Sequence, residues 1–481
     1  MPMTSGGPAV ERLRDYLQNL TPEAQGLLVG ELERAILRGE EAAGSELILQ
    51  ELRRAIRAAG QPVARIGDVG RLFFAPLEPF LIDDAADHKR LGRMARVSLP
   101  PIWDWLGRDL IPAEVKALSE DINRALYNDD RVKAEQLTRA LHDRAIMRIR
   151  ETVAAVTGDD KARRRLAVQV GTPRALDDLG TLAAILGNRD ALAELARRLP
   201  SHIRALEREH VDTVQAWLDV PTAKKASAAV AINKADPLLY GLVLVLGRLA
   251  APWQLVRIAT LVAETDDTTR IAETPWAVTV TIVLGEIDCL VGELRAELKA
   301  HRPVTSLLKA IHDAVRGVRT EMDLSVDSLW SRQLVHIRTE VSNLLKAEIE
   351  SAPGHVRRLL RPRPVKEIAP GSMLDAIDVN DTEMLVEFVG ACRNYASELA
   401  VNEATTRSFS ELQHYLETGT KVLLDAMRHA GDADRPFRQS QLDAAIRFCR
   451  IVFGPDYAGL LVKAAEIAIQ SATAERKSAR A

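Results

Sequence analysis

The chain has 481 residues, of which 47% are hydrophobic and 27% are charged; these proportions are typical of a folded globular protein and exclude disordered, collagenous and low-complexity classes. Lysine and arginine total 64 against 67 aspartate and glutamate residues, a net charge of −3, so attraction to nucleic acid or to an anionic membrane has to come from local clusters. Aromatic residues make up only 4% of the chain, and frequent alanine, leucine, glutamate and arginine favour helices over sheets.

This composition predicts an all-α, multi-helical fold. We expect a helical-hairpin or solenoid-like array with a long central helix and a smaller C-terminal helical bundle, although the fixed period of the familiar repeat families is missing. The expected parts are an N-terminal helical region at 1–220, a central helical region at 237–350, a C-terminal bundle at 372–472, linkers at 221–236 and 351–371, and a disordered tail at 473–481. Helix starts are marked by a capping residue before proline at Thr21-Pro22, Thr172-Pro173 and Asp236-Pro237.

Residues 71–110 concentrate aromatic side chains around a basic segment that is predicted to be a short helix. The aromatic candidates for partner binding are Phe73, Phe74, Phe80, Trp103 and Trp105, and the basic ones are Lys89, Arg93 and Arg96. Aromatic anchors beside a basic amphipathic helix are typical of binding to an anionic membrane or to an acidic partner. The simpler interpretation is that the aromatic residues build a core and that the charges are solvated.

Two Glu-x-x-His pairs invite comparison with dinuclear metal sites, which use two such motifs on facing helices. Glu207 and His210 fall on the apolar face of their predicted helix, whereas Glu411 and His414 point away from theirs. We therefore expect no metal site, and interpret Glu207 and His210 as a hydrogen-bonded core pair, because an unpaired buried charge is costly. His142, at the edge of an apolar face, is interpreted as structural.

The most hydrophobic stretch, 237–263, is interrupted by Arg248 and Arg257. A bilayer crossing needs about 20 consecutive apolar residues, so this stretch is predicted to form two buried helices joined near Ala251 and Pro252. Residues 303–350 can form one long helix with a coiled-coil-like apolar seam, or two helices broken near Asp323 to Ser328.

A second basic cluster lies among the prolines of the expected 351–371 linker. Its members are Arg357, Arg358, Arg361, Arg363 and Lys366. These charges could neutralise phosphates in a salt-sensitive manner, although a solvated linker explains them more simply. No aromatic residue accompanies them, which disfavours stacking on single-stranded nucleic acid.

No phosphate loop, dinucleotide fingerprint, nucleophile elbow or zinc motif is present, so we expect no cofactor. The three cysteines are isolated among apolar residues and indicate a reducing compartment, and with no secretory pattern we expect a cytoplasmic protein. The leading hypothesis is a non-catalytic interaction or scaffold protein with a protein partner, or one that self-associates through the long helix. The alternatives are a peripheral binder of anionic membrane or nucleic acid, and an enzyme whose site is assembled between helices, with Glu207 and His210 as candidates.

Overall fold

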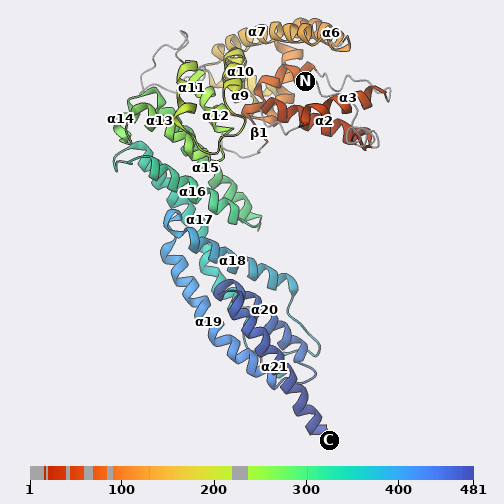
Figure 1. The fold of residues 1–481 in the computed structure, drawn as a ribbon, viewed down its shortest axis with the longest axis vertical. Coiled ribbons are helices and arrows are strands. Elements are labelled where there is room, and N and C mark those ends of the chain that lie inside the picture. Colours follow the sequence, from red (N-terminus) through yellow and green to blue (C-terminus); the bar gives the residue numbers. More distant parts are fainter. Residues whose placement is uncertain are drawn as a thin grey trace, which may run out of the picture. The chain divides into compact units, whose positions relative to one another are not determined.

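The computed structural model describes residues 13, 16–17, 20–38, 44–58, 69–83, 90–128, 130–218, 237–300 and 302–480. This part of the chain is almost entirely helical, which confirms the predicted all-α, multi-helical fold (Figure 1). It divides into two compact units: unit 1 comprises 1–286 with 321–325, and unit 2 comprises 287–320 with 326–481. The sequence predicts three regions instead, and the first predicted linker, 221–236, lies outside the described residues.

Unit 1 is built from short and medium helices with three of the predicted start signals in place. Helices begin at Pro22, Pro173 and Pro237, and the hydroxyl of Thr172 accepts a hydrogen bond from the backbone N–H of Ala175 at 3.0 Å. The α-helices of this unit are α2 (Pro22–Arg38), α3 (Ser45–Ala58), α4 (Val69–Phe74), α5 (Leu99–Trp105), α6 (Pro112–Tyr127), α7 (Arg131–Ala155), α8 (Asp160–Val170), α9 (Pro173–Gly187), α10 (Arg189–Arg198), α11 (Arg208–Leu218), α12 (Pro237–Leu246), α13 (Val256–Ala263) and α14 (Thr268–Ala272). Helix α15 (Val278–Lys299) begins in unit 1 and continues in unit 2.

Short elements connect these helices. They are η2 (Ala75–Phe80), β1 (Leu81–Ile82), β2 (Met94–Ala95), η3 (Arg96–Ser98), η4 (Leu106–Leu110), η5 (Pro252–Leu255) and η6 (Pro275–Ala277).

The hydrophobic stretch 237–263 forms two core helices, as predicted. Helix α12 is buried along nearly its whole length, and η5 separates it from α13. Arg248, between them, donates hydrogen bonds to the carbonyls of Ala196, Leu199 and Pro200 at 2.7–3.1 Å, so its charge neutralises the C-terminal end of α10. Within the described residues, no helix combines the length and apolarity that crossing a bilayer would require.

The helix predicted around Lys89, Arg93 and Arg96 is not formed. The described part of this segment is extended at β2, which pairs in parallel with β1, and then turns into η3. Gly92 has a positive φ of 71°, and a Cβ atom there would lie 2.8 Å from a methyl group of Val243. Glycine is required because of this left-handed turn and close approach, and the turn ends any helical continuation.

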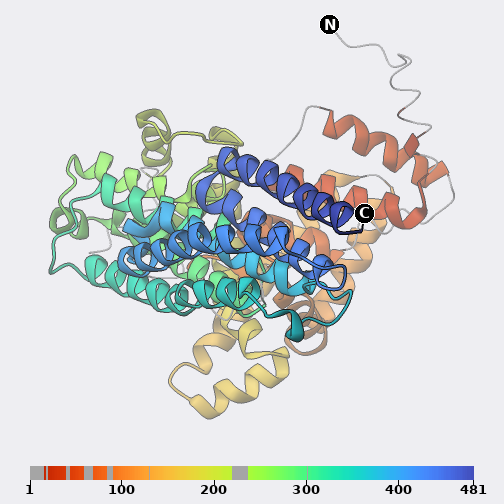
Figure 2. The same ribbon diagram turned by 90° about the horizontal axis from the view of Figure 1, so that it is seen from below.

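Unit 2 is a bundle of long helices. In both views α19, α20 and α21 run beside one another, and α17 packs against α18 and α19 (Figures 1 and 2). The elements are α16 (Thr305–Glu321), α17 (Leu329–Leu360), η7 (Val365–Glu367), α18 (Ala376–Leu399), α19 (Asn402–Arg428), α20 (Arg435–Phe453) and α21 (Pro455–Arg480). The segment 473–480 is the helical end of α21, whereas the sequence predicts a disordered tail; its alanine, glutamate, arginine and lysine residues are good helix formers.

The long segment 303–350 forms two helices, which is one of the two predicted alternatives. The break falls at 322–328, and the hydroxyl of Ser328 caps α17 by accepting from the N–H of Ser331 at 3.0 Å. Seam residues such as Leu308, Ile311, Leu334, Ile337 and Val341 are buried within the single chain. The apolar seam is therefore already covered by the protein's own helices.

The prediction of a linker over the whole of 351–371 is wrong, because α17 extends into this segment. This helix continues through Pro353 and ends at Leu360. A proline inside a helix loses one backbone hydrogen bond, but Ala352, Val356 and Leu359 around it are buried in the bundle. Tertiary packing therefore outweighs the helix-breaking signal, and only the part after Leu360 is a connection.

Candidate anion-binding site

The aromatic candidates of residues 71–110 lie in the core of unit 1. Phe73, Phe74, Phe80 and Trp105 are buried. Trp103 is half-buried and packs on Phe73 and Phe74, with ring centroids 5.4 and 6.1 Å apart. This burial agrees with the interpretation that the aromatic residues build a core. A surface anchor needs an exposed face, which these rings do not offer to a partner.

The neighbouring basic candidates are engaged inside the same unit. Arg96 forms two hydrogen bonds to the carboxylate of Glu78, at 2.7 and 3.0 Å, and this pairing raises the pKa of Arg96. Arg93 donates to the carbonyl of Pro79 at 3.1 Å, and burial lowers the pKa of Arg93. Lys89 lies outside the described residues. Arg93 and Arg96 therefore tie the segment to η2 rather than form a free basic face.

The prediction that Glu207 and His210 form a buried core pair is wrong. Glu207 is exposed and His210 is half-buried, because α11 begins at Arg208 and Glu207 precedes it. The backbone N–H of Glu207 donates to Nδ1 of His210 at 3.1 Å, so the histidine supports the start of the helix. The described chain contains no group of three or more histidine, cysteine, aspartate or glutamate residues placed to hold a metal ion.

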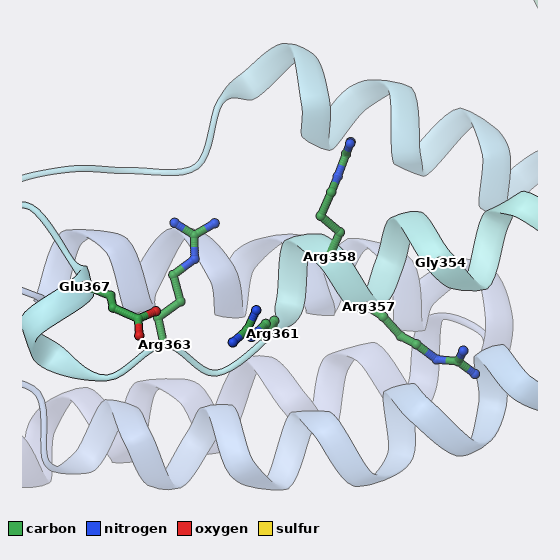
Figure 3. Close-up of a pocket in the computed structure, with 6 residues that line it drawn as sticks. All are labelled: Gly354, Arg357, Arg358, Arg361, Arg363 and Glu367. Atoms are coloured by element: carbon green, nitrogen blue, oxygen red, sulfur yellow. The ribbon is translucent and has the colours of Figure 1, made fainter.

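The second basic cluster gathers around one surface hollow in unit 2. This hollow has a volume of about 600 Å³ and is named here the arginine hollow; its lining residues are Gly354, Arg357, Arg358, Arg361, Arg363 and Glu367 (Figure 3). Helix α17 supplies Arg357 and Arg358 from its last turn, Arg361 caps it, and Arg363 follows. Arg358 and Arg363 extend toward the same side in Figure 3, while Arg357 extends the opposite way. Lys366 is exposed nearby in η7 but does not line the hollow.

The four guanidinium groups differ in how they are held. Arg357 pairs with Glu411 of α19 at 2.9 Å, and Arg358 approaches Asp378 of α18 at 3.9 Å. Both pairs are about half exposed to solvent, where ion pairs contribute at most about 1 kcal/mol. The guanidinium of Arg363 lies over the ring of Phe437, 5.0 Å from its centroid.

Arg361 has no carboxylate partner among the described residues. Arg361 and Arg363 are therefore the two lining arginines that form no ion pair with a carboxylate of the described chain.

The end of α17 would by itself oppose an anion, because carbonyl oxygens at a helix C-terminus carry partial negative charge. Gln441 of α20 counters this effect. Its side-chain amide donates to the carbonyls of Leu359 and Arg361 at 2.9 and 3.0 Å. Gln441 is fully buried, so it both satisfies these carbonyls and fixes the turn from which Arg361 and Arg363 project.

Exposed apolar side chains accompany the charges. Val365 adjoins the arginine cluster in sequence, Ile377 precedes the Asp378 that approaches Arg358, and Met373 lies in the loop between them; all three are more than half exposed. The basic residues, and Glu367 beside them, are visible in the sequence. The partners Gln441 and Glu411 come from α20 and α19, far along the chain, and no local pattern reveals them.

Comparisons of the chain with protein families, with curated proteins and with solved structures find no match.

Proposed function

We propose that the protein is a non-catalytic interaction protein that binds an anionic segment of a partner protein through the arginine hollow. The observation that carries this proposal is the gathering of four exposed arginines around one concave surface, two of them without a carboxylate partner in the described chain. Arginine and methionine are enriched at protein interfaces, whereas lysine is depleted. The exposed Val365, Met373 and Ile377 add apolar area that a partner could bury.

The same features bear on the alternative of peripheral binding to an anionic membrane or to nucleic acid. Basic and apolar side chains together are also used at membrane surfaces. However, the hollow includes Glu367 in its own lining and has Glu411 and Asp378 beside it. An extended polyanion places negative charge against every part of the surface, so all three carboxylates repel it. A short acidic segment can bind at the arginines and is repelled less. We therefore favour a polypeptide partner.

The test is a direct comparison of three anionic probes. A fluorescent polyglutamate peptide, a duplex DNA and vesicles containing phosphatidylserine are titrated with the full chain at 50 mM NaCl. Replacing Arg361 and Arg363 together by glutamine should weaken peptide binding at least about tenfold, since each lost charge-assisted hydrogen bond is worth about 1.5–3 kcal/mol.

The matched control replaces Arg164 and Arg165 of α8 by glutamine. These arginines are equally exposed but belong to unit 1, and the double variant should bind the peptide as the original protein does. Equal weakening in both double variants would contradict a localised site. Binding of only the duplex or only the vesicles, lost in the Arg361/Arg363 variant, would support the alternative function.

A further inference from the structure

We infer that the arginine hollow recognises a phosphoryl group on a polypeptide, and that Glu411 and Asp378 are internal carboxylates that compete with it. This inference rests on the proposed function and specifies its ligand. Arg358, in the last turn of α17, and Arg363, just beyond the end of this helix, extend toward the same side of the hollow (Figure 3). Two guanidinium forks on one side can share the several acceptor oxygens of a phosphate, whereas the planar carboxylate matches a single fork.

The charges of the hollow favour a dianion over a carboxylate. A phosphorylated serine or threonine carries a charge of about −1.5 to −2 at neutral pH. Glu411 holds Arg357 by one contact of 2.9 Å, and Asp378 lies 3.9 Å from Arg358. Because these contacts are solvent-exposed and weak, a ligand with twice the charge can displace them. Arg357, once released from Glu411, then turns from its side of the hollow toward the ligand and joins Arg358, Arg361 and Arg363.

Glu367 limits the ligand to one compact anionic group. It lies in the lining of the hollow, beyond Arg363 in Figure 3, and it repels a chain of closely spaced phosphates. A single phosphoryl group can sit at the arginines away from Glu367. The ring of Phe437 is 3% exposed and covered by Arg363, so it offers an unpaired base no platform for stacking. The other ring beside a lining arginine, that of Tyr415, donates its hydroxyl to the carbonyl of Arg357 at 3.4 Å.

Residues next to the phosphoryl group would meet the exposed side chains of Val365, which lies between the lining residues Arg363 and Glu367 in sequence, and of Ile377, which precedes Asp378. These contacts distinguish a polypeptide from inorganic phosphate, because apolar burial adds affinity that the free ion cannot gain. The hollow, at about 600 Å³, is large enough for a phosphoryl group together with the side chains beside it.

The experiment uses the full chain and a nine-residue fluorescent peptide with a central phosphoserine flanked by leucine and alanine. Its serine and glutamate counterparts serve as matched ligands, and binding is followed by fluorescence anisotropy. We expect the phosphopeptide to bind at least about tenfold more tightly than the glutamate peptide. Replacing Arg361 by glutamine should remove most of this difference.

The decisive variant is Glu411→Gln, which keeps the size of the side chain but releases Arg357. We expect it to bind the phosphopeptide about threefold more tightly, the size of effect that loss of an exposed competing ion pair produces. Glu403→Gln is the matched control, since Glu403 is an exposed glutamate of the same helix, two turns away from Glu411. A purely structural role for Glu411 would leave affinity unchanged or reduce it, and would not raise it.

Several results would overturn the inference. Equal affinity for the phosphoserine and glutamate peptides, or unchanged or weaker phosphopeptide binding in Glu411→Gln, would exclude phosphoryl recognition with internal competition. If polyglutamate binding still depended on Arg361 and Arg363, the proposed function would survive that result. Displacement of the peptide by inorganic phosphate at equal concentration, or tighter binding to phosphatidate vesicles, would exclude the polypeptide ligand. If none of the anionic probes bound at the hollow, both the inference and the proposed function would fail.

Discussion

At the scale of single residues, His142 shows how burial fixes a protonation state. It lies on α7, is 2% exposed, and its Nε2 donates to the carbonyl of Phe73 at 2.8 Å, while its Nδ1 is buried without a hydrogen-bond partner in the described chain. Desolvation by burial, aided by the nearby charge of Arg189, lowers the pKa of His142 to about 4. The neutral form is therefore the one that fits the core, in agreement with the structural role predicted from the sequence.

This lowered pKa predicts that acid destabilises the fold. Between pH 6.5 and about 4 the unfolded chain binds a proton at this position and the folded chain does not, so stability falls as pH falls through this range. The expected loss of unfolding free energy from this residue is about 2 kcal/mol between pH 7 and pH 5. Urea unfolding at both pH values would measure it in the original protein and in His142→Gln, whose amide can still donate to Phe73.

The glutamine variant separates this residue from the other titrating groups. It should be less stable at pH 7, because glutamine packs imperfectly in the place of the imidazole. Between pH 7 and pH 5, however, its unfolding free energy should fall by about 2 kcal/mol less than that of the original protein. Identical pH dependence in the two proteins would show that His142 does not titrate differently in the folded and unfolded states.

At the scale of elements, α17 shows where sequence patterns succeed and where tertiary packing overrides them. The break before Leu329 is one of the two alternatives that the sequence leaves open, because Asp323, Ser325 and Ser328 interrupt the apolar seam; the structure has Ser328 as the N-cap. The end of the helix is not predicted, because Pro353-Gly354 is a strong stop signal in isolation. Contacts with α18, α19 and α20 carry the helix on to Leu360, and this extension places Arg357 and Arg358 on a rigid element. The basic residues of the site are thus visible in the sequence, but their geometry is not.

The proline inside α17 predicts a stabilising substitution. Pro353→Ala restores a backbone N–H to the helix, and proline costs about 3 kcal/mol relative to alanine in a helix interior. Removing the buried ring loses two methylene groups, about 1.6 kcal/mol, so the net gain in unfolding free energy should be about 1 kcal/mol. Urea unfolding followed by circular dichroism would measure it. Ser351→Ala, which changes no backbone donor, should stay within about 0.5 kcal/mol of the original, and a less stable Pro353→Ala would mean that packing of the ring outweighs the missing hydrogen bond.

At the scale of the whole molecule, the arrangement into two units has no counterpart in composition. The dividing point, after Glu286, lies inside the continuous helix α15. Gly285 and Asp288 flank this point without interrupting the helix, and no proline falls there. Length and composition therefore predict the fold class, whereas the partition of the chain follows from long-range packing. The net charge is likewise a poor guide to local structure, because the near-neutral total of −3 hides the concentration of arginine at the hollow.

This balance of charge predicts how an anionic ligand associates. Because the whole chain carries −3, no long-range field draws an anion in, and the polyglutamate peptide should associate at about 10⁵–10⁷ M⁻¹s⁻¹, the range of encounters without electrostatic steering. Raising NaCl from 50 to 500 mM screens the short-range contacts in the hollow and should act mainly by speeding dissociation. Stopped-flow fluorescence at the two salt concentrations would separate the two rate constants. An association rate that fell more than about tenfold with salt would mean that a much larger basic surface than the arginine hollow guides the ligand.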